Sequence, residues 1–156
     1  MDTAASTIAN PADRAAVADD RIALWNPMAA ALWSLALTPA FGAWLHARNW
    51  ERLGNQEKAS EAQAWCAAVC ILIAINQLVA TIAVAWGAEF TIPPTAGLVL
   101  FAVWYCLSAH AQVKYVVANH GPAYQRLGWL RPILGAVAAM VGFLLVGGIL
   151  MGIAMQ

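Results

Sequence analysis

Long stretches without a formal charge alternate with short charged stretches along this chain. No Asp, Glu, Lys or Arg occurs between Arg21 and Arg48 or after Arg131, and two more such windows flank Glu89. The four windows hold 26, 27, 24 and 25 residues. A helix needs about 20 apolar residues to cross a hydrocarbon layer of about 30 Å, so each window suits one crossing. The pattern predicts an all-α membrane protein with four transmembrane helices in an up-down bundle.

Helix-start and helix-stop signals place the ends of the predicted spans. Asn26-Pro27 supplies an N-cap and a favoured first helical residue. Ser60-x-x-Gln63 is a capping box before the second span, and Pro93-Pro94 stops a helix before the third. The expected spans are about 28–47, 65–87, 95–117 and 132–155, within a membrane domain over 26–156.

Pro39 is the unusual feature of the first span. A proline inside a helix removes a backbone hydrogen bond, so we expect the first helix to be kinked there, with Thr38 or Ser34 satisfying the freed group. A second arrangement, which we favour less, makes the Pro39 segment a re-entrant hairpin and leaves the N-terminal tail inside the cell.

Residues 1–25 form a polar tail ahead of the first span. Asn10-Pro11 predicts the start of a short interfacial helix that ends near Leu24, and a disordered tail is the equal alternative. The tail has acids where a signal peptide has a basic region and an apolar run, so no cleavable signal is expected.

Lysine and arginine placement predicts the orientation. Loop 48–61 and loop 114–131 each hold three basic residues, whereas the turn between the second and third spans holds none. The positive-inside rule makes both basic loops cytoplasmic. Four spans then put both termini in the periplasm, across a bacterial inner membrane.

Composition excludes several classes of function. The chain is 62% hydrophobic and 10% charged, against about 25% charged residues in soluble domains. Net charge is zero and the basic residues are scattered, which argues against nucleic-acid binding. No span holds a carboxylate, lysine or arginine, which disfavours proton-coupled or ion-coupled transport. No catalytic motif is present, so we do not expect an enzyme.

Uncharged polar side chains in the second and third spans are the candidates for ligand or helix contacts. Buried amides and hydroxyls need partners, which a neighbouring helix or a small ligand would supply. These candidates are Asn76, Gln77, Cys106, Ser108 and His110.

No metal or cofactor is expected. Cys66 and Cys70 are predicted to lie roughly 10 Å or more along the axis from Cys106, which is too far for a shared metal site. Haem held by His46 and His110 is an alternative, but an interfacial His46 is the simpler interpretation.

Two sets of residues are candidates for contacts between proteins. Small residues of the last span permit close helix packing, within the chain or with another chain: Gly142, Gly148 and Gly152. Basic residues of the second loop would contact lipid headgroups or dock a cytoplasmic partner: Lys114, Arg126 and Arg131.

The run LWSLALTPAFGAWLHARNWERLG, residues 32–54, resembles a segment of small multi-pass bacterial membrane proteins with no known activity. The resemblance covers one predicted span and its exit, and it implies a bacterial inner membrane. We therefore expect a non-catalytic protein that acts through helix–helix contacts as an accessory or assembly subunit of a membrane complex, or as a homo-oligomer. The alternatives are an immunity protein against a pore-forming or membrane-directed toxin and a small-ligand or haem-binding protein.

Overall fold

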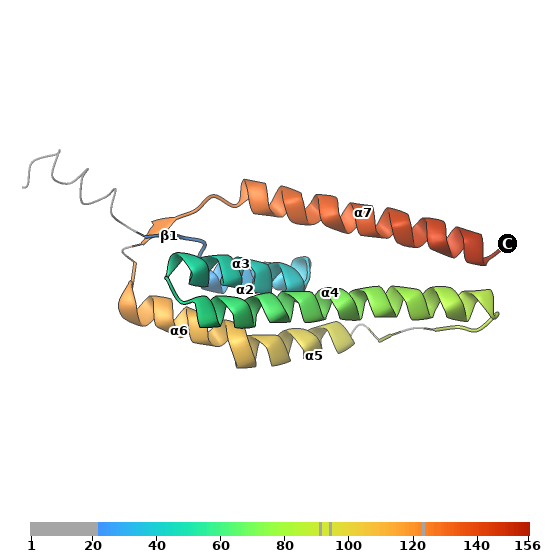
Figure 1. Cartoon of the computed structure of the whole chain (residues 1–156), viewed down its shortest axis with the longest axis horizontal. Coiled ribbons are helices and arrows are strands. Elements are labelled where there is room, and N and C mark those ends of the chain that lie inside the picture. The colour runs from blue at the N-terminus through green and yellow to red at the C-terminus, as the bar shows by residue number, and fades with distance from the viewer. Residues whose placement is uncertain (1–21, 91, 94, 123) are drawn as a thin grey trace, which may run out of the picture.

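Three long helices run side by side in the computed structural model, which describes residues 22–90, 92–93, 95–122 and 124–156 (Figure 1). They are α4 (Gln56–Ala85), the continuous segment Thr95–Asn119, and α7 (Leu130–Ala154). Each is long and apolar enough to cross a membrane. The all-α class is therefore confirmed, and the three helices indicate a multi-pass membrane protein.

The first predicted span is two short antiparallel helices. α2 (Pro27–Ala36) and α3 (Pro39–Arg52) lie against each other, and His46 Nε2 donates to the Pro27 carbonyl oxygen at 3.2 Å. Because residue 46 meets residue 27, the chain reverses between the two helices. The single helix over 28–47, kinked at Pro39, is thus corrected to a helical hairpin, as in the less favoured arrangement. This hairpin is not among the helices long enough to cross a membrane.

Thr38 and Pro39 cause the reversal. Thr38 is extended, with φ −165° and ψ 158°, and its side-chain oxygen accepts a hydrogen bond from Phe41 N at 3.3 Å. Pro39 is the first residue of α3, where a missing N–H costs nothing because that group has no helical partner. The proline therefore starts a helix instead of kinking one.

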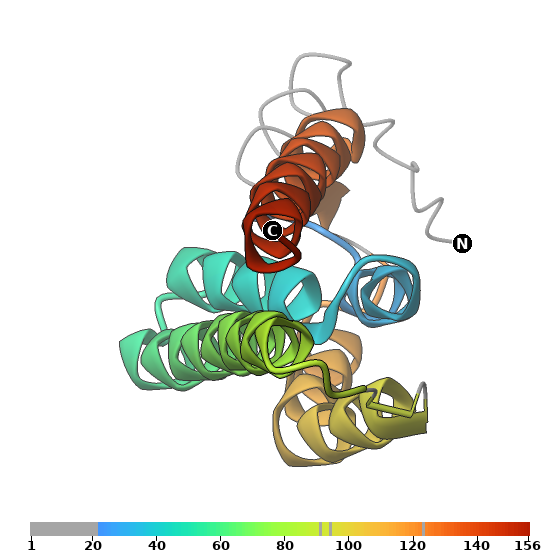
Figure 2. The same ribbon diagram turned by 90° about the vertical axis from the view of Figure 1, so that its right-hand side faces the viewer.

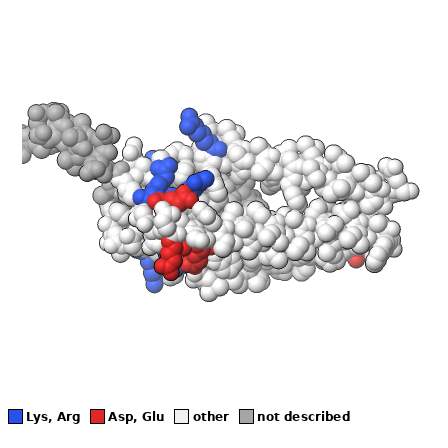
Figure 3. Space-filling view, in the orientation of Figure 1, with Lys and Arg blue, Asp and Glu red and all other residues white. Residues whose placement is uncertain are grey.

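Both ends of the hairpin lie at one end of the bundle, which we call the loop end. It contains the turn after α3 and the segment between Asn119 and Leu130, and charged side chains gather there (Figure 3). Gly54 lies just after the end of α3 and has φ +74°, a conformation that favours glycine. Asn55, not the predicted capping box at Ser60, caps α4 by accepting from Lys58 N at 3.0 Å.

A short parallel strand pair also lies at the loop end. β1 (Ala23–Leu24) pairs with β2 (Gln125–Arg126), with Leu127 N donating to Leu24 O at 3.0 Å. The interfacial helix predicted up to Leu24 falls mostly on residues 1–21, which lie outside the described residues. Its last part is the strand β1. The C-terminal end of α7 lies at the opposite end, which we call the far end (Figure 1).

The long helix Thr95–Asn119 contains one π-helical turn. α5 (Thr95–Trp104) continues through η1 (Tyr105–Ala109) into α6 (His110–Asn119). In a regular helix, residues four apart drift by about 40° per step around the axis. The wider π turn reduces this drift, so that Trp104, Ser108 and Gln112 are all buried along one row.

The hairpin occupies the centre of the bundle. Seen along the bundle axis, α7 lies on one side of it and α5–α6 on the other (Figure 2). One core cluster joins Ala31 and Ala43 of the hairpin to Trp104, whose side chain is fully buried. Close packing here requires glycine: a Cβ atom at Gly42 would lie 1.8 Å from Ser34 Oγ and 2.5 Å from Trp104 Cη2.

We expect Gly42→Ala to destabilise the protein, because the added methyl group would force Ser34 and Trp104 apart. Overpacking of this kind costs about 1–3 kcal/mol. Thermal unfolding in detergent would measure it. The control is Gly97→Ala in α5, where nothing lies within 4 Å of the added atom and stability should not fall. Equal unfolding temperatures for the two variants would contradict the packing described.

Candidate functional site

A buried amide pair holds the hairpin in place. Asn49 Oδ1 accepts from Trp25 N at 3.0 Å, and Asn49 Nδ2 donates to Trp25 O at 2.8 Å. Asn49 Nδ2 also lies 3.2 Å from Gln112 Oε1, and Gln112 Nε2 donates to His46 O at 2.8 Å. Both amide side chains are fully buried. The pair therefore links the chain before α2, helix α3 and helix α6.

His46 completes this polar cluster. A carbonyl only accepts, so His46 Nε2 carries the proton in its bond to Pro27 O. The ring packs edge-on against Trp104, with centroids 5.5 Å apart. His110, the other histidine considered for haem, instead packs against Tyr105 at 5.7 Å.

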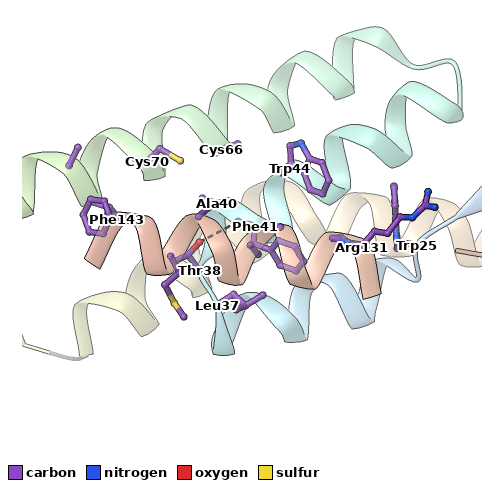
Figure 4. Close-up of a pocket in the computed structure, with 17 residues that line it drawn as sticks. Trp25, Leu37, Thr38, Ala40, Phe41, Trp44, Cys66, Cys70, Arg131 and Phe143 are labelled. Carbon is purple, nitrogen blue, oxygen red and sulfur yellow. Dashed lines mark hydrogen bonds between the residues drawn. The ribbon is translucent and has the colours of Figure 1, made fainter. Parts of the chain in front are cut away.

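The second feature is an apolar cavity of about 670 Å³ between the hairpin, α4 and α7. Residues from the hairpin tip, the middle of α4 and one face of α7 line it, including Leu37, Cys70 and Ala139. It extends from Trp25 and Arg131 at one end to Phe143 at the other (Figure 4). The volume lies within the range of about 300–1,000 Å³ typical of small-ligand sites.

Arginine side chains surround the loop end of the cavity. Arg131 lines the cavity itself. Arg52 lies over the Trp25 ring at 5.2 Å, and Arg48 over the Trp44 ring at 5.9 Å, and both rings line the cavity. Arg48 is paired with Glu51 at 2.9 Å, whereas no described carboxylate forms a salt bridge with Arg52 or Arg131. The cavity thus combines apolar walls with cationic groups at one end only.

The polar candidates of the predicted second and third spans, which are α4 and the Thr95–Asn119 helix, do not come together in one cluster. Asn76 and Cys106 are exposed. Gln77 faces α7, where its side chain would contact a Cβ atom on Gly147 at 3.0 Å. Ser108 is buried in the π turn beside the hairpin. Among the described residues, no hydrogen bond joins the candidates of α4 to those of η1 and α6.

The packing and docking candidates lie on open surfaces. Gly142, Gly148 and Gly152 have no atom within 4 Å of an added Cβ, and the neighbouring Gly147 makes the contact with α4 instead. The three basic candidates, Lys114, Arg126 and Arg131, are exposed. Of these, Arg131 also lines the cavity, which its sequence context did not indicate.

Within the described part of the chain, no three His, Cys, Asp or Glu side chains are grouped as a metal site would require. Comparisons with protein-family models, with curated proteins and with solved structures find no match to this chain.

Sequence reasoning missed Asn49 and the cavity. Asn49 follows the apolar part of the first window, so it was expected to lie in water. Thr38-Pro39 is the signal that could have found both, because it repeats the N-cap and first-residue pattern of Asn26-Pro27. A second helix start at this point implies the reversal that buries Asn49 and forms a wall of the cavity.

We expect Asn49→Leu to reduce stability markedly, because the backbone N–H and C=O of Trp25 and the Gln112 amide would lose buried partners. Leaving such groups unpaired costs roughly 1–3 kcal/mol each. Thermal unfolding in detergent is the measurement. Asn76→Leu is the matched control at an exposed amide and should cost little. An unfolding temperature for Asn49→Leu as high as that of the control would refute the assigned role.

Proposed function

We propose that the protein is a non-catalytic component of a bacterial inner membrane that works through helix contacts in the plane of the membrane. Its role would be that of an accessory or assembly subunit, with another membrane protein or a second copy as the partner. The observation that carries this proposal is the outer side of α7, which no described residue covers.

Within the described part of the chain, α7 makes few contacts for its length. Pro132 and Gly147 are its only buried residues, among 25. Gly148 and Gly152 point away from the cavity, at about 180° and 140° from Ala139 around the helix axis at 100° per residue. Their open Cβ positions leave a flat strip on which a partner helix can approach closely.

Large apolar side chains flank this strip. Leu145 and Ile149 are 63% and 64% exposed. Lipid would cover such side chains equally well, so they do not by themselves favour a partner. The glycine pair favours a partner helix, because a rigid helix can pack closely against the exposed backbone at these positions, whereas flexible lipid tails pack less well.

Orientation is part of the same proposal. If the basic loops are cytoplasmic, the loop end faces the cytoplasm and the far end faces the periplasm. The hairpin enters and leaves on one side, which supports three crossings plus a re-entrant element. We therefore revise the expectation of two periplasmic termini: residue 22 is assigned to the cytoplasmic side and Gln156 to the periplasmic side.

Gly148→Leu combined with Gly152→Leu should separate the protein from its partner without unfolding it, because the added side chains occupy the close-approach strip. The measurement is the mass of the complex isolated from the native membrane in a mild detergent. Ala102→Leu on α5 is the matched control, since Ala102 is exposed. A wild-type protein that always purifies as a single monomeric species would refute the proposed function.

Reporter fusions would test the orientation. We expect alkaline phosphatase fused after Gln156 to be active, because it would be exported, and green fluorescent protein fused there to be dark. Both reporters inserted after Gly128, in the loop before α7, should behave in the opposite way. An inactive phosphatase at Gln156 would indicate an inverted protein and would contradict the proposed orientation.

A further inference from the structure

We propose that the cavity between the hairpin, α4 and α7 binds one acyl chain of an anionic phospholipid, whose phosphate lies at Arg131. This goes beyond the proposed partner contacts, which use the opposite side of α7. The two proposals can therefore fail separately.

The length of the cavity fits one leaflet of a bilayer. Arg131 and Phe143 mark its two ends along α7, and twelve residues at 1.5 Å span about 18 Å. Half of a hydrocarbon layer of about 30 Å is about 15 Å. An acyl chain that enters the cavity from the loop end would therefore contact the cavity walls over the full thickness of that leaflet.

Charge favours an anionic headgroup. Arg131 is the charged residue of the lining, and it lies at the end where Trp25 and the nearby Arg52 also lie. α7 begins at Leu130 with no side-chain cap from the described residues, so the positive end of this helix lies next to Arg131. Pro132 in its first turn has no N–H, and Ile133 N already donates to Trp129 O at 3.1 Å. Basic pockets between membrane helices are known to hold anionic headgroups in this way.

The chemistry of the cavity disfavours polar occupants. Thr38 is the lining hydroxyl, and its oxygen already accepts from Phe41 N. A polar cofactor would find few partners deep in the cavity, whereas an acyl chain needs none.

Native mass spectrometry of the purified protein would test the site. The probes are phosphatidylglycerol and phosphatidylcholine with identical chains, added in turn to the detergent-solubilised full chain. We expect one phosphatidylglycerol to be retained in preference to phosphatidylcholine. Arg131→Gln should reduce this preference about fivefold, the value for one charge near a membrane surface. Arg126→Gln, an exposed arginine outside the lining, should not.

A second pair of variants tests the cavity itself. Ala139→Phe places a ring in the cavity and should lower retention at least tenfold, whereas Ala138→Phe, outside the lining, should leave it unchanged. Cysteine alkylation covers the case in which Ala139→Phe does not fold. In the wild-type protein, phosphatidylglycerol should slow alkylation of Cys70, which lines the cavity, relative to Cys106, which is likewise exposed but lies outside the lining.

Equal retention of the two lipids, or equal loss in Arg131→Gln and Arg126→Gln, would overturn the headgroup assignment. Equal retention by the Ala139 and Ala138 variants would overturn the cavity assignment. The cavity assignment would also be overturned if phosphatidylglycerol left the ratio of Cys70 to Cys106 alkylation rates unchanged.

Discussion

The structure depends on satisfying the backbone groups of a hairpin that is too short to cross a membrane. Wherever a chain reverses or a helix ends away from water, its N–H and C=O groups need protein partners. Thr38 supplies one at the tip, and Asn49 supplies two at the base by bonding both backbone groups of Trp25. Gln112 then connects Asn49 to α6. Without these hydrogen bonds, a single continuous helix over the same residues would be more stable than the hairpin, because it would pair more of its backbone groups.

The hairpin determines the packing of the other helices. Two short helices side by side present a broad surface, against which α4 packs along α3 and the row of Trp104, Ser108 and Gln112 packs from the other side. The tight contact at Gly42 fixes the distance between α2, α3 and Trp104. Between the hairpin, α4 and α7, the described side chains do not fill all of the space. The apolar cavity is this unfilled part of the structure.

Sequence patterns predicted the three long helices well. Spans expected at 65–87, 95–117 and 132–155 correspond to α4, the Thr95–Asn119 segment and α7, because absence of charge over 20 or more residues leaves little alternative to a long apolar helix. The prediction of a single span in the first charge-free window was wrong for a physical reason. A charge-free stretch of 26 residues can also contain a reversal: α2 lies within it, and α3 begins in it and continues to Arg52. The length of the stretch does not distinguish this hairpin from a single span. The N-cap and proline at Thr38-Pro39 are the signal in the sequence that distinguishes two helices from one.

The candidate site was less predictable than the fold. Polar residues inside spans are the usual signal of a site, and they directed attention to Asn76 and His110. The cavity has almost no polar lining, and it exists only because the chain reverses at Thr38. Its one charged residue, Arg131, was expected to act from a loop. A cavity formed by topology leaves no local pattern in the residues that line it.

The pairing of β1 with β2 has a mechanical consequence for α7. Two strand residues and the bond from Trp25 Nε1 to Gly128 O, at 3.0 Å, anchor the chain just before this helix begins. Beyond that anchor, α7 is about 37 Å long. A tilt of about 5° about Trp129 would therefore move its C-terminal end by about 3 Å. The contact between Gly147 and Gln77 of α4 is what opposes such a tilt beyond the anchor.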